Sequence, residues 1–192
     1  PVQARAGRPC DRHPPQVSPL RQVLGCLAGA LLFAALPVRP AAAFPNCTSP
    51  PAPDVDWQGC NYSDRQLGKV DLQRANLRDL SYFHGDLTGS DLSEADARRS
   101  KFIGSKLAGV KFDRARLNNA DLTDTDLTGA SFRQTDLRNA HLFRAKLRNA
   151  DFTGALLDGT DFLLTDLSGA TWTDGKTRCA EGSVGQCTPA AK

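Results

Sequence analysis

Residues 115–134 read ARLNN ADLTD TDLTG ASFRQ, which is four groups of five residues with one shared pattern. Each group begins with a small residue and has a large apolar residue, its centre, in third place: Leu117, Leu122, Leu127 and Phe132. The pattern extends from Arg65 to Asp174 without insertion or deletion and gives 22 centres, 21 of them large and apolar. A period of five fits neither the face of an α-helix nor the alternation of a β-strand.

One group of five residues cannot bury an apolar face alone, but stacked groups can. The pattern therefore predicts a solenoid whose successive coils lie about 4.8 Å apart, as paired strands do. The motif seen in Ala75-Asn76-Leu77, Ala120-Asp121-Leu122 and Ala150-Asp151-Phe152 resembles the pentapeptide repeat family. This resemblance covers residues 60–174 and implies an all-β fold, a right-handed quadrilateral β-helix with four repeats in each coil. The 22 repeats then give 22/4, or about 5.5, coils.

A second period of 20 residues supports four groups per coil. When the centres are sorted by this period, one column is leucine throughout: Leu67, Leu87, Leu107, Leu127, Leu147 and Leu167. Another changes from leucine to aromatic residues and stays aromatic: Leu72, Leu92, Phe112, Phe132, Phe152 and Trp172. This segregation is expected if each side chain packs on its equivalent one coil away.

The segment before the repeats has the features of an export signal. Residues 1–21 are rich in Pro and Arg and are predicted to be disordered. An apolar run of 14 residues, Val23 to Leu36, precedes Ala41-Ala42-Ala43, which predicts a signal peptide cleaved before Phe44. A membrane anchor would need roughly 20 apolar residues. We therefore expect a periplasmic or extracellular protein without a stable membrane span in its mature form.

The expected organisation is a tail and signal peptide over 1–43, an N-terminal cap over 44–64, the solenoid over 65–174, and a C-terminal cap and tail over 175–192. Caps are needed because an open solenoid exposes unpaired backbone at both ends. We expect the Pro-rich stretch with Trp57 to cover the first coil. Residues Thr173 to Cys187 should cover the last.

Net charge excludes two classes of function. The chain carries +3, but residues 1–43 hold five of its 24 basic and one of its 21 acidic residues, so the remainder has 19 basic and 20 acidic residues, net −1. Residues 65–174 hold 16 of each sign. This balance argues against binding to nucleic acid, and equally against an acidic mimic of DNA.

Four cysteines remain after the expected cleavage, and an exported chain favours disulfides between them. Three pairings are possible. The two local pairs flank the solenoid, and we predict Cys47–Cys60 and Cys179–Cys187. Neither pair has the close spacing of zinc ligands, and no histidine lies near either in the sequence.

No constellation of residues predicts an enzyme, a metal site or a cofactor. An outward row with alternating charge looks like an acid–base system: Asp86, Lys106, Asp126, Lys146 and Asp166. A solvated row of ion pairs, each contributing about 0–1 kcal/mol, is the simpler interpretation. His84 and His141 lie about three coils apart, on the order of 14 Å, and cannot share a metal.

One outward row breaks the polar rule and forms a candidate contact stripe. It follows the centres of one column and consists of Phe83, Ile103, Phe143 and Leu163, with Leu164 beside the last. Contiguous exposed apolar residues often mark a contact surface. Three interpretations stay open at this point: the stripe docks a partner or a second copy, residues 44–60 or 175–192 cover it, or it is incidental.

The sequence thus predicts an exported, non-catalytic scaffold or protein-binding module that contacts an unknown protein partner or associates with itself. The alternative, which the family resemblance alone suggests, is a cytoplasmic DNA-mimicking protein directed at a topoisomerase. Such a protein should be strongly acidic and should lack an export signal, so this chain fails both expectations.

Overall fold

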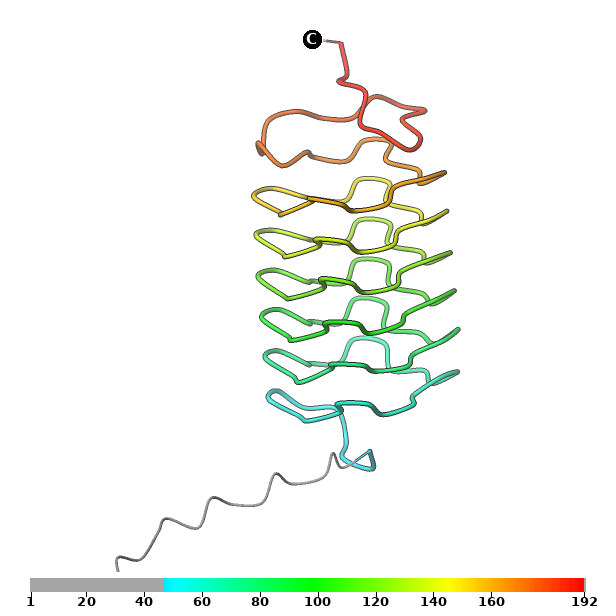
Figure 1. The fold of residues 1–192 in the computed structure, drawn as a ribbon, viewed down its shortest axis with the longest axis vertical. Helices are drawn as coiled ribbons and strands as arrows, with labels where there is room; N and C mark the ends of the chain where they lie inside the picture. The colour runs from blue at the N-terminus through cyan, green and yellow to red at the C-terminus, as the bar shows by residue number, and fades with distance from the viewer. Residues whose placement is uncertain (1–46, 192) are drawn as a thin grey trace, which may run out of the picture. The chain divides into compact units, whose positions relative to one another are not determined.

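The computed structural model describes residues 47–191, which stack as successive coils (Figure 1). The predicted disordered tail, the signal peptide and its cleavage site before Phe44 lie outside the described residues. The predictions made for them are therefore not tested by the fold.

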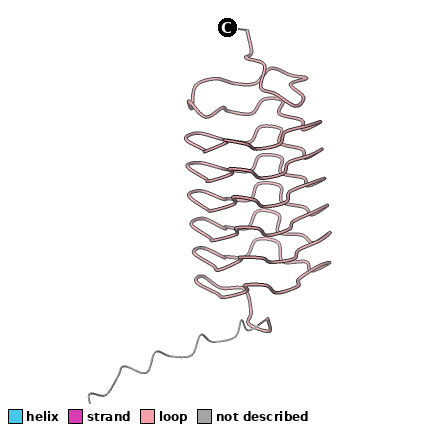
Figure 2. Ribbon diagram, viewed as in Figure 1, coloured by secondary structure: helices cyan, strands magenta, loops and turns pink. Residues whose placement is uncertain are grey.

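The described residues form a β-helix held by single-residue bridges. Parallel bridges join residues 20 apart, from Asp56↔Asn76 to Asp151↔Thr171 without a break. Each bridging residue is the one immediately before a centre. Within residues 47–191 there is no helix and no strand of several residues, and Figure 2 accordingly shows loop throughout. The 20-residue period predicted from the sequence is thus the period of the hydrogen bonding.

Tight turns between the bridges explain the five-residue period. In a typical turn the N–H of Ala75 donates to the carbonyl of Leu72 at 3.1 Å, and Arg74 between them has a φ of 57°. A positive φ at this position is found in type II turns and strongly disfavours β-branched residues. No Val, Ile or Thr occupies the equivalent position anywhere from Lys69 to Asp174.

The frequent Asp before the centre has a local structural reason. Its carboxylate accepts the backbone N–H two residues later, as in the 2.7 Å bond from Thr88 to Asp86 and the 3.0 Å bond from Ser93 to Asp91. Asp and Asn favour turns through such bonds to the backbone. The side chain therefore stabilises the turn that follows the centre.

The interior of the column is filled by the centres and by the small residues two places before them. Phe112, Phe132 and Phe152 are fully buried, and their ring centroids lie 5.4 and 5.1 Å apart in a stacked arrangement. The predicted aromatic column is confirmed. Buried hydroxyls in the small position are satisfied by the preceding coil: Thr135 Oγ1 donates to the carbonyl of Phe112 at 2.6 Å. Such bonds make a polar residue acceptable inside the column.

The regular backbone begins before the segment 65–174 that the side-chain pattern indicated. Trp57 and Tyr62 are buried centres in step with Leu67, and their rings lie 4.3 Å apart. The expectation that Trp57 lies over the first coil as a lid is wrong. Its indole N–H donates to the carbonyl of Ser49 at 3.2 Å, and the Tyr62 hydroxyl donates to that of Cys47 at 2.6 Å. Residues from Cys47 to Ser49 therefore pack against this first pair of aromatic centres.

At the other end, the C-terminal segment folds back over part of the last coil. Antiparallel bridges join Asp166 to Val184 and Thr171 to Arg178. The cysteines of each predicted pair lie at disulfide distance, with Cα atoms 5.5 Å apart for Cys47–Cys60 and 4.9 Å for Cys179–Cys187. Each pair fixes one end of the described chain.

Candidate functional site

The predicted contact stripe is a continuous row along one face of the column. Hydrogen bonds between successive coils set this register: the N–H of His84 donates to the carbonyl of Ile103 at 3.1 Å, and that of Arg144 to the carbonyl of Leu163 at 3.0 Å. Phe83, Ile103 and Phe143 are half-buried in their turns. The stripe is therefore a row of partly exposed side chains one coil apart.

The stripe is most exposed at its C-terminal end. Leu163 and Leu164 are 59% and 55% exposed, while the guanidinium of Arg144 covers part of Phe143 at 5.4 Å from the ring centroid. Two of the segments considered as covers for the stripe are described over residues 47–60 and 175–191, and these leave both leucines exposed.

The alternating row of Asp86, Lys106 and their equivalents is stacked as expected, since each member bridges the next. The expected ion pairs are absent, however: within the described part of the chain, none of these Asp–Lys neighbours lies within 4.0 Å. The pKa of Asp86 is lowered mainly by hydrogen bonds from the hydroxyl and N–H of Thr88, and only weakly by the charge of Lys106. The short Asp side chain is engaged by its own turn, so it does not reach the next coil.

Ion pairs instead form at the turn position two residues after the centre. They join residues 20 apart in Arg74–Asp54, Arg99–Asp79, Arg114–Glu94 and Arg144–Asp124. All are exposed, so each contributes at most about 1 kcal/mol. Their sequence signal was available, because opposite charges recur 20 residues apart at this turn position.

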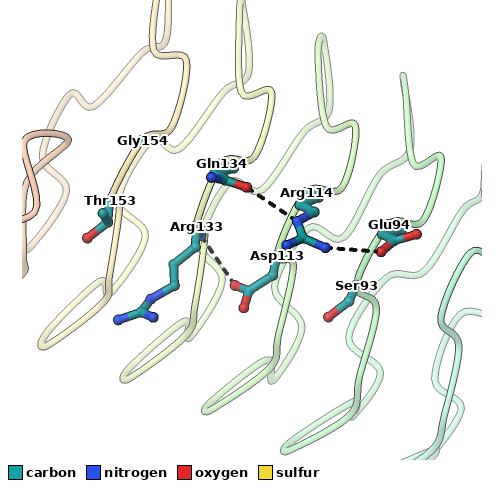
Figure 3. A pocket seen from close by; sticks show the side chains of 8 residues that line it. All are labelled: Ser93, Glu94, Asp113, Arg114, Arg133, Gln134, Thr153 and Gly154. Carbon is teal, nitrogen blue, oxygen red and sulfur yellow. Dashed lines mark hydrogen bonds and ion pairs between the residues drawn. The ribbon is translucent and has the colours of Figure 1, made fainter.

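A polar groove on another face, not anticipated from the sequence, is the largest concave feature with convergent polar groups (Figure 3). Its volume is about 450 Å³, and turns of four successive coils line it, from Ser93 and Glu94 to Thr153 and Gly154. Arg114 reaches Glu94 at 3.5 Å and Gln134 at 3.3 Å. Because its charges pair with one another, the groove offers no free nucleophile or base.

Arg133 shows how completely this groove is neutralised. Its backbone N–H donates to Asp113 at 3.3 Å and its Nε to Asp151 at 2.6 Å. Burial raises the pKa of Asp151, but hydrogen bonds from Thr153 and Arg133 outweigh this effect and hold the pKa below its ordinary value. The carboxylate is therefore charged near neutral pH, and a guanidinium compensates it.

Two further features bear on function. Within residues 47–191 no group of three His, Cys, Asp or Glu side chains is placed to hold a metal ion. No helix in that part of the chain is long and apolar enough to cross a bilayer.

The repeating turns, the 20-residue bridges and the filled interior agree with a family comparison. The model of the pentapeptide repeat region matches residues 95–172. The chain is a pentapeptide-repeat protein. No curated protein matches the sequence.

Among solved structures, the chain is similar to HetL, a pentapeptide-repeat protein involved in heterocyst differentiation regulation in the cyanobacterium Nostoc sp. strain PCC 7120. The identity is 26% and the TM-score 0.44, over 64% of each chain, so the match spans less than two thirds of HetL. It is also similar to a pentapeptide-repeat protein of the Arabidopsis thaliana thylakoid lumen, at 22% identity and a TM-score of 0.45, over 68% of this chain and 82% of that one. A third is Rfr23 from the cyanobacterium Cyanothece 51142, at 22% identity and a TM-score of 0.42, over 61% and 90%.

Proposed function

We propose that this pentapeptide-repeat protein is an exported, non-catalytic binding or scaffold module that contacts a protein partner through the contact stripe. The observation that carries the proposal is the exposure of Leu163 and Leu164, 59% and 55%, at the end of a row of apolar turn residues. Rows of side chains at a fixed spacing on a rigid column are the usual recognition surface of solenoids. A filled interior and a groove of paired charges support a non-catalytic role.

In this proposal the column is a right-handed quadrilateral β-helix of about 5.5 coils over residues 65–174, with caps at 44–64 and 175–192. Oxidised Cys47–Cys60 and Cys179–Cys187 pairs close the caps. The pairs support export, because disulfides persist in oxidising compartments.

The stripe is tested with the double variant Ile103→Asp and Phe143→Asp. Ala108→Asp is the matched control, because Ala108 occupies the same turn position on another face. We expect the double variant to fold with unchanged circular dichroism, and to lose either self-association in sedimentation or the co-purification of a specific envelope protein. If both variants behave as the wild type in both assays, the stripe is not an interface.

Export is tested separately by fractionating cells and weighing the product. We expect a mature chain that begins at Phe44, is found outside the cytoplasm and has no free thiol. A cytoplasmic chain that retains residues 1–43 would contradict export and favour the topoisomerase-directed alternative.

A further inference from the structure

The C-terminal segment covers only half of the last coil. It satisfies residues 165–172: the N–H of Leu167 donates to Ser183 at 2.8 Å, that of Gly169 to Cys179 at 3.0 Å, and the carbonyl of Thr165 accepts from Gly185 at 3.0 Å. Residues 155–164, which we call the open edge, have no such cover among the described residues. The open edge has backbone groups without a partner in residues 47–191: the N–H groups of Leu157, Gly159, Phe162 and Leu164 and the carbonyls of Ala155 and Thr160.

These groups point off the end of the column, because their equivalents one coil earlier all donate or accept in that direction. The N–H of Leu137 donates to the carbonyl of Leu156 at 3.0 Å, and that of Leu142 to Asp161 at 2.8 Å. The open edge is therefore a β-edge that can receive another chain. Unpaired edges of this kind are templates for strand addition.

Apolar side chains gather at the same edge. Among the described residues, four large apolar side chains are strongly exposed: Leu156 at 48%, Leu163 at 59%, Leu164 at 55%, and Val184 at 54% on the adjoining segment. Leu164 also has a φ of 58°, and it is the only apolar residue with a positive φ in the described chain, glycine aside. An exposed leucine in a conformation that leucine disfavours is typical of a functional surface.

The open edge is acidic. Residues 149–175 contain five Asp and no Lys or Arg. Asp151 and Asp166 pair with arginines of the preceding coil, at 2.6 and 3.2 Å. Asp158 and Asp161 form no ion pair with any described residue, and Asp161 accepts only the N–H of Leu163, at 2.9 Å. The edge thus combines hydrogen-bond donors with exposed leucines and two uncompensated carboxylates.

We propose that the open edge binds an extended polypeptide segment with alternating apolar and basic side chains, which adds as an antiparallel strand across Leu156 and Asp161. The covered half shows the geometry: the N–H after Asp166 and the carbonyl before it both pair with the residues flanking Val184. The same donor and acceptor flank Asp161. A second copy fits less well, because two open edges would bring Asp158 and Asp161 of both chains together.

This inference rests on the proposed binding role but uses different atoms from Phe83, Ile103 and Phe143. It is tested with the full chain, labelled with ¹⁵N, and an acetylated peptide of four Lys-Val repeats. Titration should slow the hydrogen exchange of the four unpartnered N–H groups. A Glu-Val peptide should bind at least about tenfold more weakly, as should a Lys-Val peptide methylated on its valine nitrogens.

Asp158→Lys combined with Asp161→Lys should weaken the Lys-Val peptide about tenfold and favour the Glu-Val peptide. Both changes suit the fold, since Lys101 and Arg138 occupy the equivalent positions in earlier coils. Asp121→Lys is the matched control, because Asp121 accepts the N–H of Thr123 at 3.1 Å just as Asp161 accepts that of Leu163.

Four results would overturn the proposal. They are equal affinity for the methylated peptide, an equal effect of the control variant, protection of the four N–H groups in the free monomer, which would mean that the chain's own residues occupy the edge, and protection that appears only as the chain self-associates. The variant Ile103→Asp with Phe143→Asp should bind the peptide normally, which separates failure of the open edge from failure of the contact stripe.

Discussion

Gly85 is required by the space that Tyr82 occupies. A Cβ atom on Gly85 would lie 2.5 Å from Cζ of Tyr82 and 2.9 Å from the carbonyl oxygen of Arg65. The ring cannot swing aside freely, because its hydroxyl donates to the carbonyls of Arg65 at 2.8 Å and Asp86 at 2.9 Å. Gly85→Ala should therefore overpack the interior and break these bonds, lowering the free energy of unfolding by about 2–4 kcal/mol.

The chain contains its own compensating arrangement. Two turns in the same column pair a leucine centre with a larger residue at the equivalent of Gly85, as in Leu142 with Ala145. We expect Gly85→Ala to cost little once Tyr82→Leu has been introduced, so the two changes should couple by about 2 kcal/mol or more. Urea unfolding of the oxidised protein, followed by tryptophan fluorescence and circular dichroism, measures all four members of the cycle. An equal cost of Gly85→Ala in both backgrounds would refute the steric argument.

Three further changes test the C-terminal end. Hydrogen bonds from the hydroxyl and N–H of Thr177 lower the pKa of Asp174 to about 2, so the turn should keep its stabilising effect above pH 3.8 and lose it as the pH falls toward 2; an NMR titration midpoint near 3.8 would contradict this. Cys187→Ala should remove about 2–3 kcal/mol of constraint from the loop that starts at Cys179, and the N–H groups that this segment covers should then exchange faster; unchanged exchange would show that the hydrogen bonds alone hold it. Leu164→Gly should relieve the positive φ and raise stability by about 0.5–1 kcal/mol, and a fall in Tm would count against strain at this residue.

The column could be predicted from the sequence because its period is visible in the residues that the fold must bury. Centres such as Phe112 and Phe132 recur every 20 residues and stack in the structure. The start of the regular backbone was missed because Trp57 and Tyr62 follow Val55 and Cys60, not the Ala-Asp pair of later repeats. A period of five in the centres alone would have included them.

The candidate surfaces were predictable only as rows. The order of Ile103 and Phe143 along one face follows from the period, but their exposure depends on neighbours such as Arg144, whose guanidinium lies over the Phe143 ring. The ion pairs were assigned to the wrong row because side-chain reach decides them: Asp86 is held by its own turn, whereas arginine spans the gap to the next coil. The open edge was not predictable at all, because it depends on where the C-terminal segment turns back.

The bridges between residues 20 apart also determine how such a chain can change in length. Each inner coil is hydrogen-bonded only to the coil before it and the coil after it. Removing or duplicating 20 consecutive residues would therefore shorten or extend the protein by one storey and leave both ends intact. Changes of 5 or 10 residues would rotate every later side chain to a different wall, so gene duplications should be tolerated in whole storeys.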